Sequence, residues 1–90
     1  MPRPGMMAVA ARSMALELMR MKFTIEFEQE EDGRWIADVL ELPGVMVYGQ
    51  TRKEARAKAH ALAHRVMAER IERDEWEPTV SIIFEETEAA

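Results

Sequence analysis

The chain contains no cysteine, so it can form neither a disulfide nor a thiolate metal centre. Nothing in its composition therefore indicates an oxidising compartment, and we expect a cytoplasmic protein. An apolar run long enough to cross a bilayer is also missing, because Arg12 and Glu17 interrupt the apolar stretch near the N-terminus. The same two charges argue against the alternative interpretation of this stretch as a secretory signal.

Basic residues are in the minority: 12 lysines and arginines stand against 17 acidic residues, which gives a formal charge of −5. This balance disfavours nonspecific binding to a phosphate backbone and favours a basic protein partner. A length of 90 residues allows one domain with a small core, and such a core gains from association. We therefore expect a homo-oligomer, either a dimer or a tetramer.

Residues 1–20 are rich in helix formers, and they predict an amphipathic helix from about Met6 to Arg20. The apolar face of this helix would consist of Met7, Ala11, Met14 and Leu18. We interpret the segment as a helical extension, either genuine or read from an upstream start codon. A methionine-rich face favours contact with another surface over exposure to water.

From Lys22 onward the hydrophobic pattern repeats every second residue, which predicts a strand with one buried and one solvated face. The buried side chains would be Phe23, Ile25 and Phe27, and the solvated ones Thr24, Glu26 and Glu28. Asp32 and Gly33 then predict a hairpin turn. The return strand, Trp35 to Leu40, is apolar on both faces, as is typical of a central strand or of one covered on its second face.

A corner follows this hairpin. Pro43 fixes its own φ and restricts Leu42 to an extended conformation, while Gly44 can adopt a positive φ at no steric cost. The corner therefore ends the second strand and starts a short third one, Val45 to Tyr48.

Thr51 and Glu54 have the spacing of a capping box, so a helix is predicted from Arg52 to about Asp74. The stripe that would lie on the sheet consists of Ala55, Ala59, Leu62, Ala63 and Val66. The opposite side carries small residues that could accept a second helix, with the N-terminal one as the candidate: Ala57, Ala61 and Ala68.

A fourth strand is predicted from Thr79 to Phe84. The domain would then span residues 21–85, and residues 86–90 would form an acidic tail. A strand that follows a helical crossover lies parallel to the strand beside it, so the sheet order should be 3-2-1-4. The fold class is thus α+β, with the order β-β-β-α-β after the N-terminal helix.

One set of residues joins the corner to the helix start: Leu42, Pro43, Gly44, Gly49, Thr51, Glu54 and Ala55. This pattern resembles the signature of the HicB-like antitoxin family, and the likeness extends over residues 22 to about 84. The resemblance implies a partial ribonuclease H-like fold with its helix on one face of the sheet. It also implies that the chain binds and occludes a small basic ribonuclease toxin of the HicA-like kind.

The sequence departs from the family pattern at Glu41, where an aspartate is usual, and at Val45, where a cysteine is common. It also carries no DNA-binding segment after the fourth predicted strand, so we do not expect direct DNA binding or autorepression. The alternative function is a stand-alone, homo-oligomeric structural or interaction domain without a toxin partner.

The chain offers little for catalysis or metal binding. His60 and His64 have a zinc-ligand spacing on one helix face, but no third ligand is placed by the sequence, so exposed or interface histidines explain them better. Glu26 and Glu28 would lie about 7 Å apart on one strand face. A metal-dependent nuclease needs more converging carboxylates than these two. We expect no enzyme activity, no metal and no cofactor.

Acidic side chains cluster on the outer face of the first strand and in its turn, without an intervening lysine or arginine: Glu26, Glu28, Glu30, Glu31 and Asp32. We predict that this cluster contacts the toxin, since acidic surfaces speed the encounter with a basic partner. The alternative is that these charges only keep a sheet face soluble.

Overall fold

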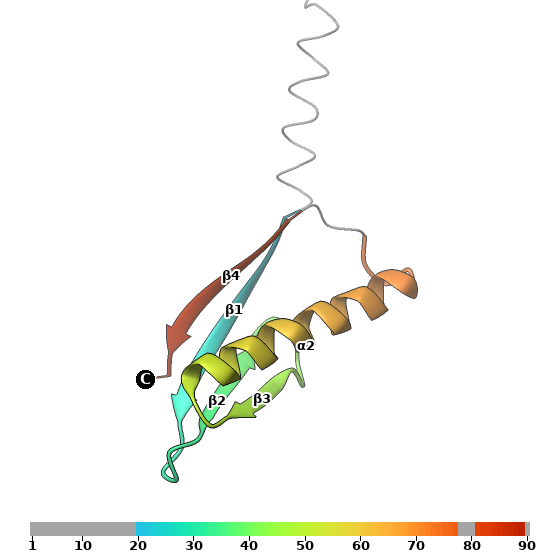
Figure 1. Ribbon diagram of the computed structural model, residues 1–90. Helices are drawn as coiled ribbons and strands as arrows, with labels where there is room; N and C mark the ends of the chain where they lie inside the picture. The colour runs from blue at the N-terminus through green and yellow to red at the C-terminus, as the bar shows by residue number, and fades with distance from the viewer. Residues whose placement is uncertain (1–19, 78–80, 90) are drawn as a thin grey trace, which may run out of the picture.

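The computed structural model describes residues 20–77 and 81–89. The elements in chain order are β1 (Arg20–Gln29), β2 (Trp35–Val39), β3 (Met46–Gly49), α2 (Arg52–Glu72) and β4 (Ser81–Glu88), as Figure 1 shows. The predicted α+β order β-β-β-α-β is confirmed for these residues. The predicted N-terminal helix lies outside the described residues except for its last residue, Arg20, which instead begins β1.

The four strands form one mixed sheet in the order β3-β2-β1-β4, as predicted. Because β1, β2 and β3 follow one another through tight turns, each pairs antiparallel with the next. The chain then crosses back through α2, and β4 pairs parallel with β1. The predicted central position of the second strand is also confirmed, since β2 lies between β3 and β1.

The helix α2 covers one face of the sheet and packs mainly over β2 and β3 (Figure 1). The core between them is apolar: Phe23, Ile25, Phe27, Ala37, Val39, Leu42, Val45, Ala55, Ala59, Ala63 and Met67. Alanines on the buried stripe bring the helix backbone close to the sheet. A Cβ added to Gly49 would lie 2.5 Å from the Ala55 backbone nitrogen, so this close approach requires a glycine.

The corner between β2 and β3 forms as its sequence predicts. Gly44 has a φ of +87°, and the Val45 N–H donates to the Leu42 carbonyl at 3.0 Å. The side chain of Leu42 is buried in the core. The corner therefore reverses the chain and contributes one of the larger core side chains.

Several element boundaries differ from the sequence prediction. The strand β1 begins two residues before Lys22, β2 ends one residue before Leu40, and β3 is shifted by one residue toward the helix. The helix ends at Glu72, and Asp74 adopts a left-handed conformation with a φ of +58°. The fourth strand continues to Glu88, so residues 86–88 belong to the sheet and not to an acidic tail. The physical reason is that the acidic end of β4 finds cationic partners on α2.

Within residues 20–77 and 81–89, no helix combines the length and the apolar character that crossing a membrane requires.

Candidate protein-binding surface

The face of the sheet opposite α2 is not covered by any described residue, and we call it the open face. Side chains alternate along a strand, so the neighbours of the buried residues point to this face. The large hydrophobic side chains with most exposure all lie there: Leu40 (48%), Met46 (49%), Tyr48 (41%) and Ile83 (41%). Met46 and Tyr48 lie beside β2, whereas Ile83 lies apart from them, next to Lys22 of β1. Exposed hydrophobic side chains that gather on one side of a sheet face favour an interaction site there.

Two carboxylates face each other across the middle of the open face. Glu26 on β1 is the register partner of Asp38 on β2, which places their Cβ atoms about 5 Å apart. Both residues are half-buried, and no basic side chain of the described residues pairs with either. Like charges directly opposite one another destabilise a sheet. A cationic partner would relieve this repulsion.

Glu28 lies two residues after Glu26 on the same face, opposite Ile36, and so extends the acidic surface along β1. The predicted site therefore has a strand part, Glu26 and Glu28, which the structure places on the open face. Sequence reasoning missed Asp38, although its position in the alternation of the second strand could have placed it opposite the first-strand glutamates.

The rest of the predicted site lies in the turn. Residues 28–32 and Arg34 line a shallow depression of about 460 Å³ at the hairpin tip. Asp32 accepts hydrogen bonds from the Arg34 N–H at 3.0 Å and from Arg34 Nε at 2.7 Å. These bonds lower the pKa of Asp32, the backbone bond most strongly. Asp32 is thus already paired within the turn, whereas no basic side chain of the described chain pairs with Glu30 or Glu31.

Arg34 links the turn to the aromatic part of the open face. Its guanidinium carbon lies 4.9 Å from the centre of the Tyr48 ring, a cation–π distance. Tyr48 is therefore held between the hairpin tip and the apolar surface, where an exposed aromatic side chain can act as an interface anchor.

Glu41 has a structural task that the sequence did not reveal. Its carboxylate accepts the Thr24 N–H at 2.6 Å and the Thr24 hydroxyl at 2.8 Å, and so joins the corner to β1. Burial raises the pKa of Glu41, but the two bonds from Thr24 and the charge of Lys22 outweigh it, so the pKa is lowered. The available sequence signal for this role was the position of Glu41, directly before the Leu42-Pro43-Gly44 corner, where the family pattern also has an acidic residue.

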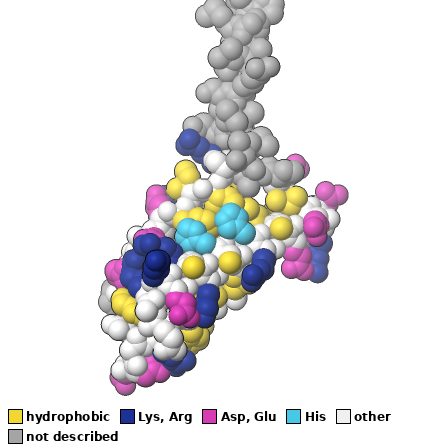
Figure 2. All heavy atoms as spheres, in the orientation of Figure 1, with side chains coloured by type: hydrophobic (Ala, Val, Ile, Leu, Met, Phe, Trp, Pro, Cys, Tyr) yellow, Lys and Arg dark blue, Asp and Glu magenta, His cyan; other side chains and the backbone are white. Residues whose placement is uncertain are grey.

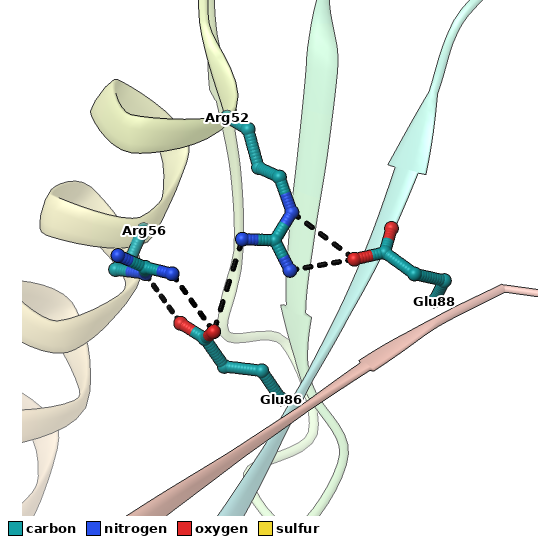
Figure 3. A network of polar contacts seen from close by, with 4 residues as sticks. All are labelled: Arg52, Arg56, Glu86 and Glu88. Atoms are coloured by element: carbon teal, nitrogen blue, oxygen red, sulfur yellow. Dashed lines mark hydrogen bonds and ion pairs between the residues drawn. The ribbon is translucent and has the colours of Figure 1, made fainter.

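On the helix side, two arginines bind two glutamates of β4 (Figure 3). Arg52 Nε lies 3.0 Å from Glu88 Oε1, and an Arg56 terminal nitrogen lies 2.8 Å from Glu86 Oε2. The Arg52 guanidinium also stacks on the buried Phe27 ring at 3.9 Å. We call these four charged residues the arginine clamp. It fastens the acidic end of β4 to the first turns of α2.

His60 and His64 continue the row of the arginine clamp along α2. The His60 ring stacks on Phe84 with centroids 3.9 Å apart, and the His64 ring lies 5.8 Å from the same ring. Figure 2 shows both histidines beside hydrophobic side chains. Burial, followed by repulsion from His64 and Arg56, lowers the pKa of His60 against the attraction of Glu86. The described residues contain no group of three metal-ligating side chains.

Comparison with known proteins identifies no relative: no family model, no curated protein and no solved structure matches the chain. The candidate surface must therefore be judged by its own chemistry.

Proposed function

We propose that the chain is a non-enzymatic, cytoplasmic antitoxin of the HicB-like kind, with a partial ribonuclease H-like fold, that binds and occludes a small basic ribonuclease toxin. The observation that carries this proposal is the pair Glu26 and Asp38. These half-buried carboxylates face each other without a cation, and exposed hydrophobic side chains lie on the same face. The sequence of the corner and the helix start supports the family assignment.

The open face has the two parts that such an interface needs. Tyr48, Met46 and Leu40 can supply affinity when water is removed from them. The carboxylates attract a basic partner and orient it during the encounter. Association with the basic toxin would cover the face and relieve the repulsion between Glu26 and Asp38. The surface of the toxin that is buried against the open face would then be occluded.

The experiment measures binding between the full chain and the basic product of a neighbouring reading frame. The double variant E26Q/D38N replaces both carboxylates by amides of similar size. It should slow association several-fold at low salt. The change should be much smaller at 1 M salt, where the Debye length is about 3 Å. Inhibition of the toxin's ribonuclease activity should weaken in parallel.

Glu72→Gln is a single-charge control, because Glu72 is exposed at the end of α2, on the other side of the sheet. It removes one negative charge from the chain without touching the open face. Equal association rates for the wild type, the control and the double variant at both salt concentrations would contradict the proposal and leave the carboxylates a role in solubility.

The alternative, a homo-oligomeric domain without a toxin, would show no binding to any neighbouring gene product. It draws support from a different part of the structure, the outer edge of β4.

A further inference from the structure

The outer edge of β4 carries a row of backbone groups that point away from the sheet. The Ala89 N–H donates to the Phe27 carbonyl at 2.9 Å, so the odd-numbered residues of β4 direct their backbone toward β1. The even-numbered residues, from Ile82 to Glu88, therefore direct their N–H and carbonyl groups outward. No described residue binds these outward groups.

The other edge of the sheet differs. The edge strand β3 is four residues long, and Lys58 Nζ of α2 donates to the Tyr48 carbonyl at 3.2 Å. A short strand with a lysine at its edge is a common protection against unwanted pairing. The edge strand β4 is eight residues long and has no corresponding lysine among the described residues. Of the two edges, β4 is the one open to a further strand.

The negative charges of β4 are already neutralised by the chain itself. Glu85 pairs with Lys22 at 3.1 Å, Glu86 with Arg56, and Glu88 with Arg52. Charges usually keep edge strands apart by repulsion. Because each of these carboxylates has a cation beside it, the repulsion between two such edges is weakened.

The uncharged half of β4 is apolar on both faces. Ile82 and Phe84 are half-buried on the helix side, and Ile83 is 41% exposed on the open face. An edge whose first half is apolar and whose charges are paired complements a second copy of itself. Two-fold symmetry would bring this segment of one chain against the same segment of another.

We propose that the chain forms a dimer in which the β4 strands of two copies pair antiparallel through their outer edges. The register places Ile83 opposite Ile83 and Ile82 opposite Phe84, so that hydrophobic side chains meet on both faces. Registers centred on Glu86 would instead bring carboxylates opposite each other. The two four-stranded sheets become one continuous sheet, and both open faces stay available.

This dimer does not depend on the proposed toxin partner. The backbone hydrogen bonds of the new strand pair supply affinity, as in other complexes formed by strand addition. The small core of each chain gains additional buried surface.

The absence of cysteine allows a direct test in the full chain. Directly opposed residues of antiparallel strands have Cα atoms about 5 Å apart, within the range that a disulfide spans. Ile83→Cys should therefore give a covalent dimer under mild oxidation. Met46→Cys is the matched control: it is equally exposed on the same face but lies on β3, and it should remain largely uncrosslinked.

A second measurement uses sedimentation over a range of concentrations. The wild type should sediment as a dimer, and Ile83→Lys should raise the dissociation constant by at least about tenfold, since the register would place two lysines directly opposite each other. Met46→Lys should leave it unchanged. A monomeric wild type overturns the proposal. So does a dimer that neither crosslinks through position 83 nor responds to Ile83→Lys.

Discussion

The two halves of the sheet are held to the helix by different forces. Beneath α2, the side of β2 and β3 is packed with buried side chains such as Val39, Leu42 and Val45. No residue of β4 is fully buried, and its contacts with α2 include the arginine clamp and the ring of Phe84 against His60 and His64. The first half should depend on hydrophobic burial and the second on charge, so salt and pH should affect the second half more.

The largest expected effect lies in the apolar half. Leu42→Ala removes a side chain that is 1% exposed and should lower the free energy of unfolding by about 3 kcal/mol. Ile82→Ala, in the half-buried part of β4, should lower it by less than about 2 kcal/mol. Urea denaturation followed by circular dichroism measures both values. Equal losses would remove the distinction between the two halves.

A smaller effect is expected where the two halves meet, at the start of α2. The Thr51 hydroxyl accepts the Glu54 N–H at 3.0 Å, so Thr51→Ala should lower the free energy of unfolding by about 1 kcal/mol. Thr51→Ser keeps the hydroxyl and is the control. A thermal melt of Thr51→Ala that matches the wild type would show that the cap contributes nothing.

The same helix start shows how far sequence reasoning reaches. The Thr51 half of the capping box was predicted from spacing alone and is confirmed. The Glu54 carboxylate, which was expected to return to the Thr51 N–H, lies 2.8 Å from Lys58 Nζ instead. Local pattern fixes a backbone cap, but the direction of a long exposed side chain is decided by competing charges nearby.

The strands and the apolar core beneath α2 were predictable for the same reason. The alternation of Phe23, Ile25 and Phe27, the Pro43-Gly44 corner and the crossover rule together specify the strands and their order, and the structure confirms that order. Periodicity is a local property of the sequence, and burial enforces it.

The acidic end of β4 was not predictable in that way. Glu86 and Glu88 were predicted to lie in an acidic tail because neither has an apolar side chain to bury. Their partners, Arg56 and Arg52, lie 30 and 36 residues away in the sequence. The same holds for Asp38 in the candidate surface. Its contribution to the acidic site depends on its position opposite Glu26 on the neighbouring strand. Pairings between charges distant in sequence emerge only from the tertiary structure.

A weaker effect should come from the arginine clamp. Arg56 is 43% exposed and Glu86 30%, so solvent screens the pair, and Arg56→Gln should lower the free energy of unfolding by less than about 1 kcal/mol. The loss should shrink at 1 M salt, which screens the wild-type pair as well. Arg65→Gln is the control, since no described carboxylate pairs with Arg65. A loss that is independent of salt would indicate that Arg56 acts through packing.

The smallest effect is expected from pH, and it tests whether His60 belongs to the charge-dependent half. The pKa of His60 is lowered in the folded chain, mainly by burial against Phe84. A group with a depressed folded pKa contributes its full stability above its unfolded pKa, about 6.5, and loses it as the pH falls toward the folded value. The melting temperature should therefore decrease slightly as the pH falls from 7.5 toward 5.5.

The interval above pH 5 isolates the histidine from the carboxylates. Glu41 and Glu86 also have lowered pKa values, but the stability that they contribute is present above about pH 4.5 and is lost only in more acidic solution. His60→Gln should remove the dependence between pH 7.5 and 5.5, because the neutral amide cannot take up a proton against Arg56 and His64. His64→Gln, at the more exposed neighbouring position, should preserve most of it. If the melting curves of the wild type and His60→Gln keep the same pH dependence, the stacked histidine does not contribute to holding β4 against α2.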